Sequence, residues 1–105
     1  MKYVNEVRQI GKLIKNKEGQ LYKESYSPTG LSRVEFRVSI PYEKKGSNQV
    51  INNLFFWKAW EKSGESVKAL QENDVVEVRG YIRKYTMKIQ DGAKTIYKEE
   101  LVALQ

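Results

Sequence analysis

Two stretches of this chain place aromatic rings among Lys and Arg side chains. The segment 79–88, RGYIRKYTMK, holds four cations and no acid, with two tyrosines and a methionine between them. The segment 52–60, NNLFFWKAW, holds two phenylalanines and two tryptophans in nine positions. Rings stack on bases of any sequence and cations contact phosphates, so this composition is typical of surfaces that bind single-stranded nucleic acid. The alternative for 79–88 is an exposed ribbon whose charges and tyrosines only keep it soluble.

The overall charge favours a polyanionic partner. The chain carries 19 Lys and Arg against 13 Asp and Glu, a formal net charge of +6. A basic balance by itself is equally compatible with mere solubility, and the clustering of cations in 79–88 is what favours nucleic acid.

Several classes of site are excluded by residue type. The 105 residues include no cysteine and no histidine, which rules out disulfides, thiolate metal sites, cysteine nucleophiles and histidine-based triads. The adjacent carboxylates Glu99 and Glu100 would point to opposite faces of a strand. We therefore expect no enzyme, no catalytic residue, no metal and no cofactor. Without a long apolar run or a signal-peptide pattern at the N-terminus, we expect a cytoplasmic, nucleoid-associated protein that does not enter membranes.

Strand-like patterns outnumber helical ones along the chain. Strands are expected at 4–14, 20–26, 33–40, 49–57, 73–88 and 94–104. One helix is expected at 58–70, because Trp60, Val67 and Leu70 recur at helical spacing and would pack in the core. A single helix between the third and fourth main strands of an otherwise β chain predicts an all-β, five-stranded OB-fold barrel, with 1–105 as one domain. Gly11, inside the first strand, indicates a bulge or a strong bend.

Alternation assigns side chains to the two faces of the expected strands. In 33–40 it puts four apolar residues on one face and leaves Arg33, Glu35 and Arg37 on the other, which is either a nucleic-acid-tracking face or an ordinary solvent face. In 79–88 it groups Arg79, Tyr81, Arg83, Tyr85 and Met87 on one face, opposite Gly80, Ile82, Lys84 and Lys88.

In the segment 52–60 either of the two alternating sets of residues could point into the barrel. If Leu54 and Phe56 point into the barrel, then Ile51, Asn53, Phe55 and Trp57 point outward. An outward Trp57 would be an exposed platform or would be covered by a neighbouring subunit, and an outward Phe55 would belong to an interface.

Four segments together resemble one known family. Residues 4–13 (VNEVRQIGKL), 26–36 (YSPTGLSRVEF), 52–62 (NNLFFWKAWEK) and 75–85 (VVEVRGYIRKY) are similar, in register, to the DNA-binding domain of bacterial single-stranded DNA-binding proteins. No single segment is diagnostic, and the four in register carry the resemblance along nearly all of the chain.

The chain also departs from that family. Ile51 stands where the family usually has a DNA-stacking tryptophan, and the family often has another tryptophan near the position of Met87. Lys58 replaces the glycine that opens the family's helix, and Arg79 replaces a glutamate. The acidic tail of family members does not follow Gln105, which suggests either trimming or a tail-less relative of the phage, plasmid, secondary-copy or primosome-accessory kind.

The resemblance implies roles for individual residues. It places Trp57 at a base-stacking position and Arg83 at a phosphate contact, and it makes Tyr85 a replacement for the ring missing near Met87. The loop that begins at Tyr42 would close over DNA. The predicted nucleic-acid-binding residues are Trp57, Arg83, Tyr85, Lys84, Tyr81, Asn53, Lys44, Lys45, Tyr42, Lys88, Arg37 and Lys12.

The expected function is sequence-tolerant binding and protection of single-stranded DNA in replication, recombination or repair. The resemblance also implies a homo-oligomer built by first-strand pairing and sheet packing, with a tetramer ranked before a dimer. The alternative is an interaction module of the replication-restart type that bridges replication proteins, with DNA binding secondary. RNA on the same surface remains a further alternative, because nothing in the sequence reads the 2′-hydroxyl.

Overall fold

A computed structural model describes residues 4–43, 45–46, 48–89 and 94–103, with the backbone alone described for 86–89 and 94–98. The elements are β1 (Val7–Ile14), β2 (Lys23–Tyr26), β3 (Ser32–Glu43), β4 (Val50–Trp60), α1 (Lys62–Lys68), β5 (Val75–Ile89) and β6 (Lys94–Ala103). This is the order that the hydrophobic periodicity predicts, with one short helix between the third and fourth main strands.

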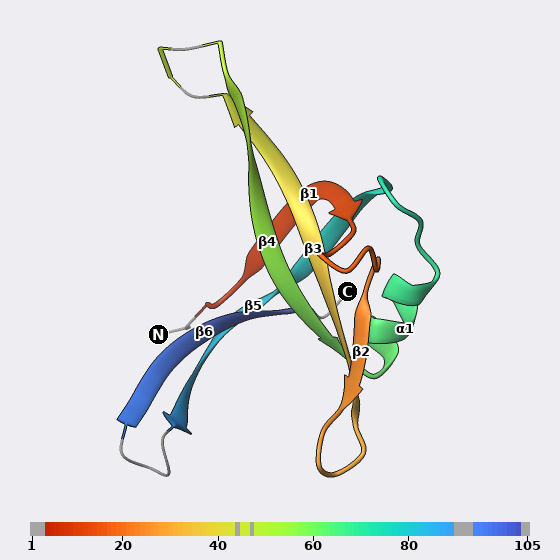
Figure 1. Ribbon diagram of the computed structural model, residues 1–105, viewed down its shortest axis with the longest axis vertical. Helices are drawn as coiled ribbons and strands as arrows, with labels where there is room; N and C mark the ends of the chain where they lie inside the picture. Colours follow the sequence, from red (N-terminus) through yellow and green to blue (C-terminus); the bar gives the residue numbers. More distant parts are fainter. Residues whose placement is uncertain (1–3, 44, 47, 90–93, 104–105) are drawn as a thin grey trace.

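The strands form a closed barrel. Their order is β1-β5-β6-β4-β3-β2, and a further pairing between β1 and β3 closes the ring around five of them (Figure 1). β4 and β6 run parallel, and the other pairings are antiparallel. β2 lies outside this closure, on the free edge of β3. The fold is an all-β barrel of the OB type, so the predicted fold class is confirmed.

β1 closes the barrel by passing from β5 to β3 at Lys12, directly after Gly11. Lys12 pairs with Val75 of β5 on one side and with Ser39 of β3 on the other. A Cβ atom on Gly11 would lie 2.5 Å from the carbonyl oxygen of Ser39, so only glycine allows the two backbones to approach this closely. β1 is strongly curved in Figure 1, in line with the bend expected at Gly11.

The core lies inside the barrel and is built by alternating residues. On β3, Val34, Phe36 and Val38 are buried while the intervening residues are partly exposed, as the alternation predicts. Residues from five other elements complete the core: Leu13, Trp57, Ala59, Val67, Val76, Val78 and Ala103. Each large apolar side chain buried in this way stabilises the fold by about 1.5–3 kcal/mol relative to an exposed one.

The helix is shorter than predicted, because β4 continues to Trp60. The chain leaves the strand at Glu61, whose φ of 50° lies in the left-handed region, and α1 begins only at Lys62. Trp60 is therefore a half-buried strand residue, and the prediction that it starts the helix and packs in the core is wrong. Val67 is buried and Leu70 packs against the core, as predicted.

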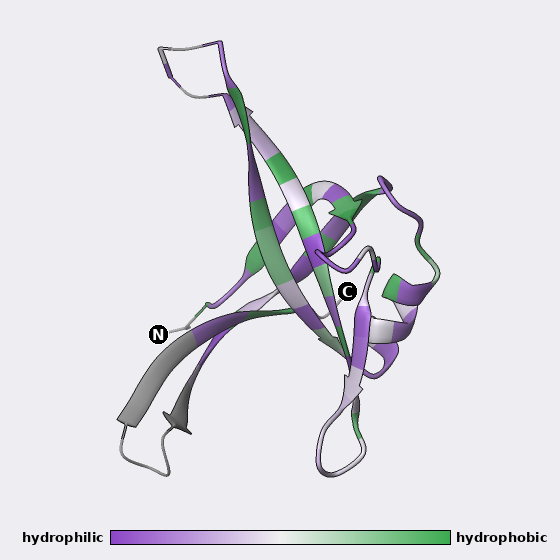
Figure 2. Ribbon diagram, in the orientation of Figure 1, coloured by the Kyte–Doolittle hydropathy of each residue, from purple (hydrophilic) through white to green (hydrophobic). Residues whose placement is uncertain are grey.

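The phase predicted for 52–60 is also wrong. The indole of Trp57 is completely buried, and its Nε1 donates a hydrogen bond of 2.9 Å to Oε1 of Gln9. Phe55 is half-buried and packs against the core, whereas Leu54 and Phe56 are 45% and 60% exposed. In Figure 2 β4 carries one continuous hydrophobic stretch, while β3 alternates between hydrophobic and hydrophilic residues.

Two pairs of strands extend beyond the barrel. β3 and β4 remain paired from Ile40 opposite Asn53 to Glu43 opposite Val50, and form the long arm at the top of Figure 1. β5 and β6 form a second arm, which diverges from β4 below their short parallel pairing at 57–59 and 101–103. Among the described residues, no helix has the length and apolar character that crossing a membrane requires.

Candidate nucleic-acid interface

The outer face of β3 and β4 pairs cations with aromatic rings. Arg33 lies opposite Trp60 and Arg37 lies opposite Phe56 in the antiparallel register. The guanidinium carbon of Arg33 is 5.7 Å from the centroid of the Trp60 ring, and that of Arg37 is 4.9 Å from the centroid of Phe56. Both distances are within the ~6 Å range of cation–π attraction. Because the intervening residues fill the core, these pairs face outward.

β5 contributes a third ring to the same face. The Nζ atom of Lys58 lies 5.5 Å from the centroid of the Tyr85 ring, and the guanidinium carbon of Arg83 lies 5.7 Å from it. We call this surface the ring face and define it by its rings and cations: Phe56, Trp60, Tyr85, Arg33, Arg37, Lys58 and Arg83. Its members lie on β3, β4 and β5, with β6 between the last two strands, and none of them belongs to the buried core.

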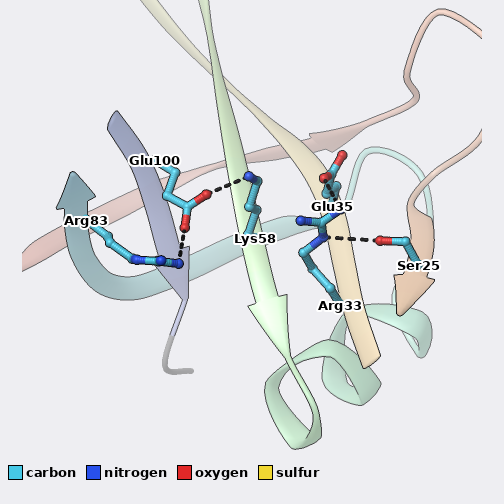
Figure 3. A network of polar contacts seen from close by, with 6 residues as sticks. All are labelled: Ser25, Arg33, Glu35, Lys58, Arg83 and Glu100. Carbon is cyan, nitrogen blue, oxygen red and sulfur yellow. Dashed lines mark hydrogen bonds and ion pairs between the residues drawn. The ribbon is translucent and has the colours of Figure 1, made fainter. Parts of the chain in front are cut away.

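Two carboxylates contact three of the four cations of the ring face. Glu100 of β6 accepts a hydrogen bond of 3.0 Å from Nη1 of Arg83 and one of 2.5 Å from Nζ of Lys58 (Figure 3). Arg33 contacts Glu35 at 3.4 Å and donates from Nε to the hydroxyl of Ser25 on β2, at 3.1 Å. These contacts connect neighbouring strands and fix where the positive charges lie.

A groove borders the ring face. The cavity measures about 340 Å³ and lies between the loop that follows β1 and the start of the β5–β6 arm. Its lining includes Arg37, Phe56, Lys58 and Tyr85 of the ring face. OB barrels commonly bind oligonucleotides on the second and third main strands, between the loops that flank them. Here those strands are β3 and β4, so the groove lies at the position that this fold uses for ligands.

The loop along the groove is ordered by Asn16. Its Oδ1 accepts hydrogen bonds from the backbone N–H groups of Glu18 and Gln20, at 3.0 and 2.9 Å. An asparagine that caps its own turn in this way restrains the loop, together with the backbone hydrogen bonds from Asn16 to Gln20 and from Gly19 to Asn16. The turn presents Lys17 to the groove, and Lys23 of β2 also lines it.

Three predicted binding residues belong to the ring face. Arg37, Arg83 and Tyr85 come together there, with Arg83 53% exposed. Tyr81 is half-buried and lies opposite Val102, on the face of β5 that carries Arg83. Lys84 points to the opposite face, where it is 80% exposed and 3.6 Å from Glu99. The two faces predicted for 79–88 are confirmed as far as Tyr85.

Other predicted residues lie away from the groove. Tyr42, Lys45 and Asn53 are exposed on the β3–β4 arm, and Lys12 is exposed on β1 beside Ser39, at the margin of the outer face. Lys44, the side chain of Lys88, the side chain of Met87 and the turn at 90–92 lie outside the described residues. Trp57 cannot be a base platform in this chain, because its indole is enclosed by the barrel.

The sequence reasoning missed Phe56, Lys58 and Trp60, which form the β4 side of the ring face. The missed signal is Lys58. If the strand continues beyond residue 57, a lysine must point outward, and strand alternation then brings Phe56 and Trp60 outward with it. A strand that ends at Trp57 lacks that constraint, and hydrophobicity alone does not choose the correct phase.

The clearest pKa shifts occur away from the groove. Hydrogen bonds from Arg8, and then from Arg79, hold the pKa of Glu77 below its usual value on the outer side of β1 and β5. The hydrogen bond from Lys68 of α1 lowers the pKa of Glu24 on β2 and raises the pKa of Lys68. Neither carboxylate lines the groove, so both shifts bear on stability rather than on ligand binding.

Comparisons with known proteins do not identify the chain. Neither a scan against protein-family models nor a search of curated proteins finds a match. The ring face and its groove are therefore the basis for a functional proposal.

Proposed function

We propose that this protein binds single-stranded DNA, without strong sequence preference, across the ring face. The observation that carries the proposal is the set of four cation–ring contacts on one outer face: Arg33 on Trp60, Arg37 on Phe56, and both Lys58 and Arg83 on Tyr85. Alternating rings and cations suit a flexible single strand of DNA, since its bases stack on flat rings and its phosphates contact positive charges.

Phe56 is the first candidate for base stacking. Its side chain is 60% exposed, which is unusual for a phenylalanine in a strand that also supplies the core. A base stacked on such a ring contributes about 1–3 kcal/mol, whatever its identity. Arg37 lies directly beside the ring and can contact the phosphate that follows the stacked base.

The wider biological role follows from the resemblance to bacterial single-stranded DNA-binding proteins. On that basis we place the protein in replication, recombination or repair, where it would shield single strands, and we expect a cytoplasmic homo-oligomer, a tetramer before a dimer. One observation supports self-association. Ile10 and Val75 are 50% and 70% exposed on the outer side of β1 and β5, away from the ring face.

Intrinsic fluorescence tests the proposal, because the two tryptophans occupy different environments. Trp60 belongs to the ring face, whereas Trp57 is buried. Titration with oligo-dT should quench part of the emission, and Trp60→Phe should abolish that quenching while leaving the Trp57 signal. The affinity should fall as salt rises, because phosphate contacts release counterions. Unchanged emission together with an affinity independent of salt would refute the proposal.

A second candidate is the interaction module that bridges replication proteins. The observation in its favour is an apolar cavity of about 280 Å³ where β4 and β6 diverge, lined by Leu54, Phe55, Ile82 and Leu101 among others. A pull-down from lysate with and without nuclease distinguishes the two functions. Proteins that co-purify through DNA are lost after digestion, and proteins bound directly are retained. Competition between matched DNA and RNA oligonucleotides decides which nucleic acid is preferred.

A further inference from the structure

A nearly buried carboxylate lies within the proposed binding surface. The side chain of Glu100 is 8% exposed, and its two oxygens are shared between Lys58 and Arg83. Figure 3 shows Glu100 reaching toward both cations from β6. A buried charge is costly unless it is paired, and this one is paired twice. Glu100 also lines both the groove beside the ring face and the apolar cavity next to it.

The position of Glu100 sets the charge that a bound strand meets. Lys58 and Arg83 are the two cations that contact the ring of Tyr85. With Glu100 between them, the three side chains carry a net charge of +1 instead of +2. Because Lys58 is only 22% exposed and hydrogen-bonded to Glu100, it is less free to turn toward a phosphate. The carboxylate therefore neutralises one positive charge that a second phosphate of the DNA would otherwise neutralise.

We propose that Glu100 is an affinity-limiting residue: an internal anion that positions Lys58 and Arg83 beside Tyr85 and offsets one of their charges. This inference rests on the proposed function. Its consequence is that base stacking, rather than charge, supplies a larger share of the binding free energy. A DNA strand bound in this way dissociates more readily than one bound by both cations, and its affinity depends less on the salt concentration.

The test compares two substitutions of equal formal charge. Glu100→Gln removes the internal anion, whereas Glu65→Gln removes an exposed carboxylate of α1, whose partner is Lys68 and which does not line the groove. Each protein is titrated with labelled oligo-dT at several salt concentrations. One additional phosphate contact steepens the slope of log affinity against log salt by about 0.7 for single strands. E100Q should show this steeper slope. The ratio of its affinity to that of the wild type should therefore be roughly threefold greater at 50 mM salt than at 200 mM salt. E65Q should keep the wild-type slope.

A charge-balanced pair guards against a structural effect of the substitution. Lys58→Gln alone leaves the three side chains with no net charge, so its slope should be shallower than that of the wild type. The double variant Lys58→Gln/Glu100→Gln has the wild-type net charge of +1, so its slope should return to the wild-type value. A residue that only supported the fold would not produce this reversal, and the pair carries the test if E100Q does not fold.

The outcomes separate the two proposals. No binding of oligo-dT by the wild type at any salt concentration refutes the proposed function, and this inference with it. Binding by the wild type with equal slopes for E100Q and E65Q refutes the inference alone. Weaker binding by E100Q also refutes it, because Glu100 would then assist binding instead of limiting it.

Discussion

The indole of Trp57 on β4 lies directly against Gly80 on β5, inside the barrel. A Cβ atom at Gly80 would be 2.9 Å from Cζ3 of the indole. The largest buried side chain of the core is thus accommodated by a residue without a side chain. This pair explains why Trp57 can point inward in a small barrel, and it places Gly80 among the positions most sensitive to substitution.

Gly80→Ala should destabilise the protein severely. The added methyl group would meet the backbone carbonyl oxygen of Val102 as well as the indole, and a backbone atom cannot move aside as a flexible side chain can. Overpacking of a core typically costs about 1–3 kcal/mol, and we expect at least the upper end of that range. Urea unfolding measures the loss.

Gly64→Ala serves as the control for Gly80→Ala. Gly64 is also buried, and an added methyl group there would lie 2.9 Å from a side-chain carbon of the buried Val34 and 3.1 Å from the carbonyl oxygen of Ala59. These approaches are less severe than the one to Val102 at Gly80, and alanine is favoured over glycine within a helix, so Gly64→Ala should be the less destabilising of the two. A Gly80→Ala protein as stable as Gly64→Ala would contradict the packing described for Trp57.

Part of this arrangement could be predicted from the sequence, because apolar and polar residues alternate along some of the strands. On β3 apolar and polar residues alternate strictly, so a single phase is acceptable and the prediction is correct. On β5 the order of Arg79, Gly80 and Tyr81 likewise leaves one sensible choice. Where the two faces of a strand differ in polarity, the register is determined by the sequence itself.

The segment 52–60 is different because both phases are apolar. One phase contains Phe55 and Trp57, and the other contains Leu54 and Phe56, so hydrophobicity does not choose between them. The choice is made by tertiary constraints: the space above Gly80, the hydrogen bond to Gln9 and the continuation of the strand past Lys58. The ring face depends on this choice, so its location could not be read from the local pattern alone.

Phe56→Ala should weaken binding of oligo-dT by the value of one stacked base, about 1–3 kcal/mol. Its effect on stability should be small, because the side chain is mostly exposed. Leu54→Ala is the matched control, since Leu54 is exposed on the same face of the same strand but offers no ring. Fluorescence anisotropy gives both affinities, and equal losses in the two variants would argue against stacking on Phe56.

Asn16→Ala should loosen the loop along the groove. The variant loses the two hydrogen bonds that Oδ1 accepts, each with a net value of about 0.5–1.5 kcal/mol. Because the loop carries Lys17, binding should weaken modestly, and hydrogen exchange at the amides of Glu18 and Gln20 should accelerate. Asn16→Asp keeps an oxygen acceptor and should restore protection of these amides. Exchange that is as slow in Asn16→Ala as in the wild type would show that the side chain does not order the turn.

Acid should destabilise the fold through Glu24 and Glu77. Their pKa values in the folded protein lie below the usual 4.5, chiefly because of hydrogen bonds from Lys68 and from Arg8. A carboxylate with a lowered pKa contributes stability above its unfolded pKa, and this contribution is lost as the pH falls through the lower, folded value. The free energy of unfolding should therefore decline as the pH drops below about 4.5.

Glu24→Gln/Glu77→Gln should be less stable at neutral pH and should lose less stability on acidification. Glu18→Gln, which removes a carboxylate without an ion pair to another described residue, should follow the wild-type curve. Urea denaturation at a series of pH values measures all three proteins, and an unchanged acid slope in the double variant would mean that these two ion pairs do not govern acid stability.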